Sequence, residues 1–121
     1  MNIHVSILID SRSSLSYIAP KVVEKYKLSK EKQKYAWVVQ LETGMKRKLT
    51  KLVKDYRLSF NGMDTTLNIN ILPLGSYDIL IGMVWLEYHK AIIDCLHKSF
   101  DCMEEEGKRH TVKGVYRPIS T

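Results

Sequence analysis

An Asn-Gly pair at residues 61–62 separates two runs in which apolar and polar side chains alternate. Residues 56–60 carry an apolar side chain at every second position, and residues 67–71 repeat the pattern. Asn and Gly both tolerate positive φ, so such a pair between alternating strands is a strong signature of a two-residue β-hairpin. This feature commits the middle of the chain to antiparallel sheet.

Short apolar runs bounded by turn residues predict further strands. A proline suits the first turn of a helix, and Pro20 opens one of the two short helices that we expect. Many short strands with turns about every ten residues predict an all-β closed barrel with one or two short helices. The predicted helices are 20–26 and 83–89, and residues 29–34 are predicted to form a charged loop. The predicted strands are 3–9, 35–41, 46–52, 56–60, 67–71, 77–82, 91–95, 99–103 and 110–112.

The length of 121 residues and the apolar fraction of 45% fit one domain with a real core. We expect a single domain over residues 1–121, with 113–121 as a tail. The first strand begins so close to the terminus that a preceding partner strand is expected to be missing from this chain.

The sequence shows no signal for a membrane span, for secretion or for a metal site. No apolar run is long enough to span a bilayer, and the first residues lack a secretory signal, so we expect a cytoplasmic protein without a membrane partner. Cys95 and Cys102 are then expected to be free thiols. Their spacing fits no common zinc pattern, and the histidines are scattered. No metal or cofactor is expected.

The net charge of +6 is concentrated in residues 21–54, which include Lys46-Arg47-Lys48. One interpretation is a solvated basic face. The alternative is contact with nucleic acid, because clustered Lys and Arg attract phosphates. No interleaving of aromatic and basic residues supports an RNA-binding module, which leaves nucleic acid as the less favoured partner.

The apolar run 7–9 leads directly into Asp10, and small polar residues follow at 11–14. This pattern predicts that Asp10 lies where a buried strand becomes a loop. Asp is also a common turn former and helix N-cap, and that ordinary role is the alternative at this point.

Two longer segments of the sequence resemble segments of a known protein family. Residues 77–86 read Tyr-Asp-Ile-Leu-Ile-Gly-Met-Val-Trp-Leu, and residues 89–95 read His-Lys-Ala-Ile-Ile-Asp-Cys. Together with the apolar run that ends in Asp10-Ser11, they resemble the retropepsin-like aspartic proteases. The similarity is closest to the protease domain of gypsy-type LTR retrotransposon polyproteins, and it extends from residue 7 to about residue 112.

The resemblance implies that Asp10 is catalytic and that each chain supplies half of the site. A second copy of the motif is absent, since Asp64-Thr65-Thr66 follows a turn instead of an apolar run. A working site would therefore require a homodimer acting on an extended peptide or polyprotein. Two adjacent carboxylates share one proton, so one activates water while the other polarises the peptide carbonyl.

The same resemblance assigns supporting roles to three groups of residues. They are a loop that supports the dyad and locks the dimer (Ser11, Arg12 and Ser13), a flap over the peptide (Trp37, Val39, Leu41, Thr43, Gly44 and Met45) and a substrate pocket (Leu80, Ile81 and Gly82).

One residue departs from the family pattern. Arg12 stands where the family has Gly, and a cation beside Asp10 favours ionisation of both acids of a dyad. Two hypotheses follow: an active aspartic endopeptidase of a retroelement polyprotein, or a catalytically degenerate module with a structural or interaction role.

Overall fold

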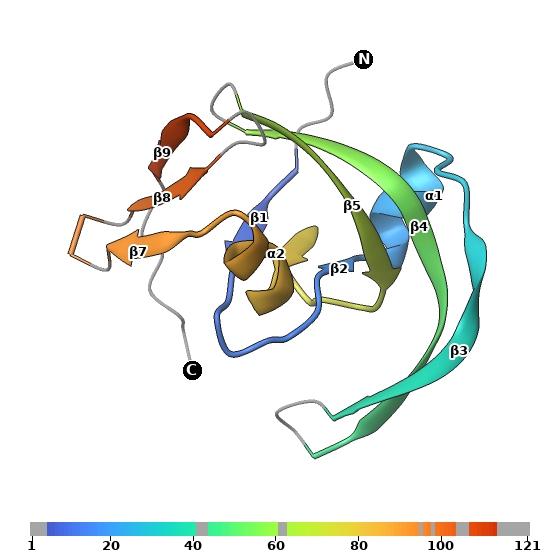
Figure 1. Cartoon of the computed structure of the whole chain (residues 1–121). Helices are drawn as coiled ribbons and strands as arrows, with labels where there is room; N and C mark the ends of the chain where they lie inside the picture. Colours follow the sequence, from blue (N-terminus) through green and yellow to red (C-terminus); the bar gives the residue numbers. More distant parts are fainter. Residues whose placement is uncertain are drawn as a thin grey trace.

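The computed structural model describes residues 5–40, 44–60, 63–94, 96–97, 99–103 and 107–113. Nine strands and two short helices occupy this part of the chain (Figure 1). They are β1 (Ile7–Ile9), β2 (Tyr17–Ile18), α1 (Pro20–Lys25), β3 (Glu31–Gln40), β4 (Lys46–Phe60), β5 (Met63–Ile71), β6 (Ile79–Ile81), α2 (Met83–Tyr88), β7 (Ile92–Asp94), β8 (Ser99–Met103) and β9 (Arg109–Lys113).

Six strands form one sheet in the order β1-β6-β2-β5-β4-β3. The short strands β1 and β6 pair in parallel, although about seventy residues of sequence separate them. The long strands β3, β4 and β5 form a curved antiparallel ribbon that extends past the short strands (Figure 1). The remaining strands form a second antiparallel sheet in the order β7-β8-β9.

The hairpin predicted around residues 61–62 is confirmed by the register, in which Phe60 pairs with Met63. The two connecting residues themselves lie outside the described part of the chain. The predicted strands 46–52 and 56–60 are in fact one strand, β4. Its register with β5 shifts between Val53 and Tyr56, where Asp55 has a φ of 52°. The Asp55 N–H donates to Asn68 Oδ1 at 3.0 Å, so a side chain compensates for the local break in the ladder.

The prediction of a charged loop at 29–34 is wrong, because β3 begins at Glu31. The backbones of Glu31 and Lys32 pair with Leu52 and Lys51 of β4. The side chains of Glu31 and Lys32 are exposed, so their charge is compatible with an edge strand. The sequence also gave no sign of β2, which is only two residues long.

A mostly β fold with two short helices is confirmed. The closure of the strands into a barrel stays a prediction, because the described pairings leave β1 and β3 as the two edges of the larger sheet. The predicted hairpin of residues 91–95 and 99–103 appears as β7 and β8, and the last predicted strand appears as β9.

The core joins both sheets and both helices. Val22 and Val23 of α1 and Trp85 of α2 pack in the same cluster as the central strands. The second sheet contributes Phe100, whose ring meets that of Trp85 edge-on with centroids 6.3 Å apart. Cys102 is a buried free thiol in this cluster, whereas Cys95 lies outside the described residues.

Within the described residues, neither helix has the length and apolar character needed to span a membrane.

Candidate active site

Asp10 follows the last residue of β1 and continues its pairing with β6. The Asp10 N–H donates to the Ile81 carbonyl oxygen at 3.0 Å, next to the pair of Ile9 with Ile81. The carboxylate is therefore held at the point where a paired strand ends, as the sequence predicted, although β1 is only partly buried and not the buried strand that was expected. The Asp10 side chain is 18% exposed.

One oxygen of the Asp10 carboxylate is already engaged. Oδ1 accepts the backbone N–H of Arg12 at 2.9 Å and lies 3.2 Å from Arg12 Nε. The first contact is the hydrogen bond of an Asx-turn, so Asp10 does fill the ordinary role of turn former. It caps neither helix, because Ala19 precedes α1 and Gly82 precedes α2. Among the described residues Asp10 Oδ2 has no hydrogen-bond partner, so this oxygen can accept a hydrogen bond from a bound molecule.

The serine-rich loop after Asp10 is fastened to the start of α2. Helices begin with backbone N–H groups that have no partner in the helix, and α2 has no side-chain cap. The carbonyl oxygens of Ser13 and Ser14 accept the N–H groups of Met83 and Val84, at 2.6 and 3.0 Å. These bonds fix the loop that carries Asp10 to the rigid end of β6 and α2.

Gly82 makes this attachment possible. A Cβ added at Gly82 would lie 2.2 Å from the Leu15 carbonyl oxygen and 2.7 Å from that of Ser13. The Gly82 N–H donates to the buried Ser16 hydroxyl at 3.0 Å. Gly82 is thus required for the close approach of two backbones, as expected for a glycine at the end of a strand.

Ser13 and Ser11 have different surroundings. Ser13 Oγ donates to the Leu15 carbonyl oxygen at 2.9 Å, and its hydroxyl also meets the Tyr17 side chain. Burial raises the pKa of the Tyr17 phenol, and the hydrogen bond with Ser13 partly offsets that rise. Ser13 therefore braces the loop from within, while Ser11 is exposed.

Arg12 occupies the family's glycine position without backbone strain. Positive φ at described non-glycine residues occurs at Lys27, Asp55 and Lys90, and Arg12 is not among them. The Arg12 side chain is 77% exposed and places its guanidinium beside Asp10. Its effect on chemistry thus comes from charge and volume and not from the shape of the loop.

The described residues of the predicted flap lie on the β3–β4 ribbon and at its tip. Trp37 and Met45 are each 55% exposed. Val39 packs against the cluster of Tyr17, Leu49 and Leu72, and Leu80 of the predicted pocket packs against the same cluster. The structure therefore brings the ribbon and the pocket strand together. Gly44 is exposed, whereas Leu41 and Thr43 lie outside the described residues.

The predicted pocket residues lie at the end of β6 and just after it, where the Ile81 carbonyl oxygen accepts the Asp10 N–H. Leu80 is partly buried, whereas Ile81 is fully buried in the main core. Leu80 can therefore meet a ligand, and Ile81 supports the site from beneath.

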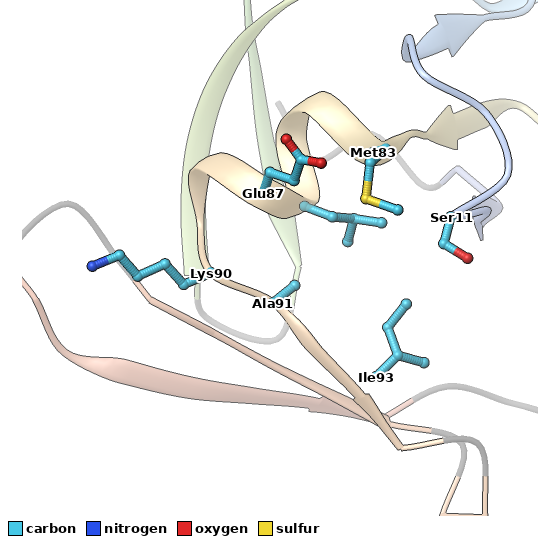
Figure 2. A pocket seen from close by; sticks show the side chains of 7 residues that line it. Ser11, Met83, Glu87, Lys90, Ala91 and Ile93 are labelled. Atoms are coloured by element: carbon cyan, nitrogen blue, oxygen red, sulfur yellow. The ribbon is translucent and has the colours of Figure 1, made fainter.

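An apolar groove of about 210 Å³ lies between α2 and β7. Figure 2 shows Met83 and Ile93 extending into this space, with Ser11 across from them and Lys90 directed away. Large apolar side chains are also exposed elsewhere on α2, on β7 and in the turn after β7, and the sequence analysis did not predict this exposure. They are Val84, Tyr88, Ile92, Ile93 and Leu96, here called the α2–β7 set. Ile92 and Ile93 are consecutive in β7, so their side chains lie on opposite faces of the strand.

The mostly β fold, with two short helices, is retropepsin-like. The chain belongs to the retroviral aspartyl protease family, whose family model matches residues 1–108. Among solved structures it is similar to the retroviral protease-like domain of Ddi1 from Leishmania major. The TM-score is 0.62 at 16% identity, over 90% of this chain and 82% of that one. At this identity the likeness shows the fold alone. No curated protein matches the chain.

Proposed function

We propose that this chain is the aspartic endopeptidase domain of a gypsy-type retroelement polyprotein and that a homodimer completes its active site. The observation that carries the proposal is the placement of Asp10. Its carboxylate is fixed at a strand end with Oδ1 engaged, while Oδ2 has no hydrogen-bond partner among the described residues. A second Asp10, related by a two-fold axis, would supply the other half of the dyad.

The chemistry follows from two facing carboxylates. Like charges a few ångströms apart cannot both ionise easily, so the pair holds one proton and titrates as a unit. The ionised acid takes a proton from water, which attacks the peptide carbonyl. The protonated acid polarises that carbonyl and later protonates the leaving amine.

Exposed apolar side chains of the α2–β7 set support a partner near Asp10. One of them, Ile93, lines the groove that also includes Ser11, the neighbour of Asp10. Among the described strands β7 is an edge of its sheet, where a further strand could pair. In this proposal a second copy seated on the groove covers Ile93 and brings the two Asp10 loops toward the axis, where Ser11 bonds across the dimer.

The substrate is an extended peptide held between the dyad and the ribbon. In this proposal the flap, formed by Trp37, Val39, Gly44 and Met45 together with residues 41–43, closes over the peptide. Leu80 lines the pocket beside the dyad, and Ile81 and Gly82 hold its wall in place. The contact of Val39 and Leu80 with one cluster supports this arrangement.

The second candidate is a catalytically degenerate module with a structural or interaction role. The observation that favours it is the ion pair of Arg12 with Asp10, because a cation there disfavours the shared proton. The two candidates differ in what the native chain does to a peptide.

The test is cleavage of an extended peptide library at acidic pH by the native chain, Asp10→Asn and the control Asp64→Asn. Asp64 is an exposed acid that precedes a Thr, like the acid of the motif, but it lies on β5. We expect cleavage by the native chain and by Asp64→Asn, and none by Asp10→Asn. Cleavage by Arg12→Gly alone would instead establish the degenerate module.

A further inference from the structure

The net positive charge of the chain resides in two neighbouring strands, β3 and β4. Strands β3 and β4 together contain eight lysines and arginines and two acids, an excess of six charges. This excess equals the net charge of the whole chain, so the remaining residues are electrically balanced. A field of one sign along a single ribbon attracts a partner of opposite charge.

Near the tip of the ribbon, the described residues do not neutralise the positive charge. Among the described residues no ion pair involves Lys46, Arg47 or Lys48. Lys32 and Lys51 are directly opposite each other in the register, and like charges in such a pair are destabilising. The arrangement costs stability in the isolated chain, and an external anion would offset that cost.

Arg47 is the cation nearest the tip of the ribbon on its inner face, which it shares with Lys51 farther along β4. Side chains alternate between the faces of a strand, so Arg47 shares the face of Leu49, which is buried. Arg47 is also directly opposite Val39, which packs in the cluster that Leu80 joins. Its neighbour Lys48 is opposite Val38, which is 62% exposed on the outer face.

A second guanidinium lies beside Asp10. Arg12 Nε is 3.2 Å from Asp10, and the Arg12 side chain is 77% exposed. In the proposed function, a peptide bound at Asp10 lies next to Arg12, and a ribbon closed over that peptide would present Arg47. Guanidinium groups bind carboxylates through paired, charge-assisted hydrogen bonds.

We infer that the peptide substrate is acidic, with a Glu or Asp side chain next to the scissile bond that Arg12 and Arg47 bind. This inference rests on the proposed function and names its substrate class. The rest of the ribbon raises the local concentration of such peptides by long-range attraction.

A peptide fits the described surface better than a nucleic acid does. Among the described strands β3 is an edge of its sheet, and the backbone of an edge strand can pair with an extended peptide. Single-stranded nucleic acids need aromatic platforms for successive bases. Among the described side chains of β3 and β4, Trp37 is the one exposed aromatic residue.

The test compares two peptides that differ only by Glu or Gln beside the scissile bond. For the native chain we expect kcat/KM to favour the Glu peptide about tenfold, as for a hydrogen bond to a charged group. Arg47→Gln should lower this ratio severalfold, and Arg12→Gln should do the same. Lys48→Gln removes the same charge from the outer face, so the ratio should stay within about twofold because exposed charges are screened.

A binding experiment distinguishes failure of this inference from failure of the proposed function. Fluorescence anisotropy with reduced-amide versions of both peptides measures recognition without cleavage. Glu-selective binding that depends on Arg47 in a chain that cleaves nothing would support the inference and overturn the protease. Equal cleavage of both peptides would overturn the inference and leave the protease. If a labelled oligonucleotide binds more tightly than the Glu peptide, and this binding depends on Arg47, the ligand of the ribbon is a nucleic acid and the acidic-peptide inference is overturned.

Discussion

Arg12 Nε lies 3.2 Å from Oδ1 of Asp10, so the candidate catalytic acid is paired with a cation two residues away in the chain. The family has Gly at this position, and the backbone here needs none, because Arg12 does not have positive φ. The consequence of the substitution is therefore electrostatic. In a dimer, two such cations would flank the dyad and favour the state in which both acids are ionised.

Replacing Arg12 is the first prediction. In the proposed dimer, Arg12→Gly would remove the cation beside each Asp10, which would favour the proton that the two acids share. We expect peptide cleavage to increase by about tenfold and to extend to higher pH, as for a charge effect of roughly one order of magnitude. Arg12→Lys is the matched control, since it keeps the charge and should retain the native pH–rate profile. An unchanged profile for Arg12→Gly would show that the ion pair has no effect on the dyad.

Ser16 and Ser14 give a second, internally controlled prediction. The buried Ser16 hydroxyl accepts the Gly82 N–H, whereas the Ser14 side chain is exposed. Ser16→Ala leaves a buried donor unpaired and should lower the free energy of unfolding by about 1–3 kcal/mol. Ser14→Ala should change it by less than about 0.5 kcal/mol. Urea denaturation measures both, and equal effects would refute the claim that Ser16 ties the loop to α2.

The third prediction compares the loss of stability on substitution of a buried and an exposed threonine of β5, Thr65 and Thr66. The Thr65 hydroxyl accepts the Trp85 indole N–H at 3.1 Å and lies 3.3 Å from Nε2 of the buried His89. The other ring nitrogen of His89 lies 2.9 Å from the Met103 carbonyl oxygen, so this group links the two sheets through α2. Thr65→Val should cost about 1–3 kcal/mol of stability because it removes the buried hydroxyl that Trp85 and His89 contact.

Thr66→Val is the matched control for this change, because the Thr66 side chain is exposed on the same strand. We expect its thermal midpoint to equal or slightly exceed the native value, since valine favours strands. A loss of stability as large as that of Thr65→Val would argue against the buried network.

The turn after β7 gives a prediction about pH. The side-chain hydrogen bond with His97 lowers the pKa of Asp94, and backbone N–H groups of His97 and Leu96 add to the effect. A lowered folded-state pKa contributes stability that is present above the unfolded pKa and is lost as the pH falls through the folded pKa. NMR titration of the Asp94 carboxyl should show a higher pKa in His97→Ala. The control Lys108→Ala should leave the titration unchanged.

The sequence predicted the elements that local chemistry determines. The hairpin at residues 61–62, both helices and the position of Asp10 at a strand end follow from alternation, proline and the apolar run. It did not predict that β3 begins at Glu31, because an exposed edge strand tolerates charged side chains. The bond between the loop and α2 also escaped prediction, since it depends on backbone carbonyls of Ser13 and Ser14 that sequence patterns do not reveal.

The central claim is that one peptide site requires two chains, and inhibitor stoichiometry tests it most directly. Isothermal titration of the native chain with a statine-type transition-state mimic should give one inhibitor bound per two chains, with binding lost in Asp10→Asn. One inhibitor bound per chain, or binding that survives Asp10→Asn, would contradict the shared dyad.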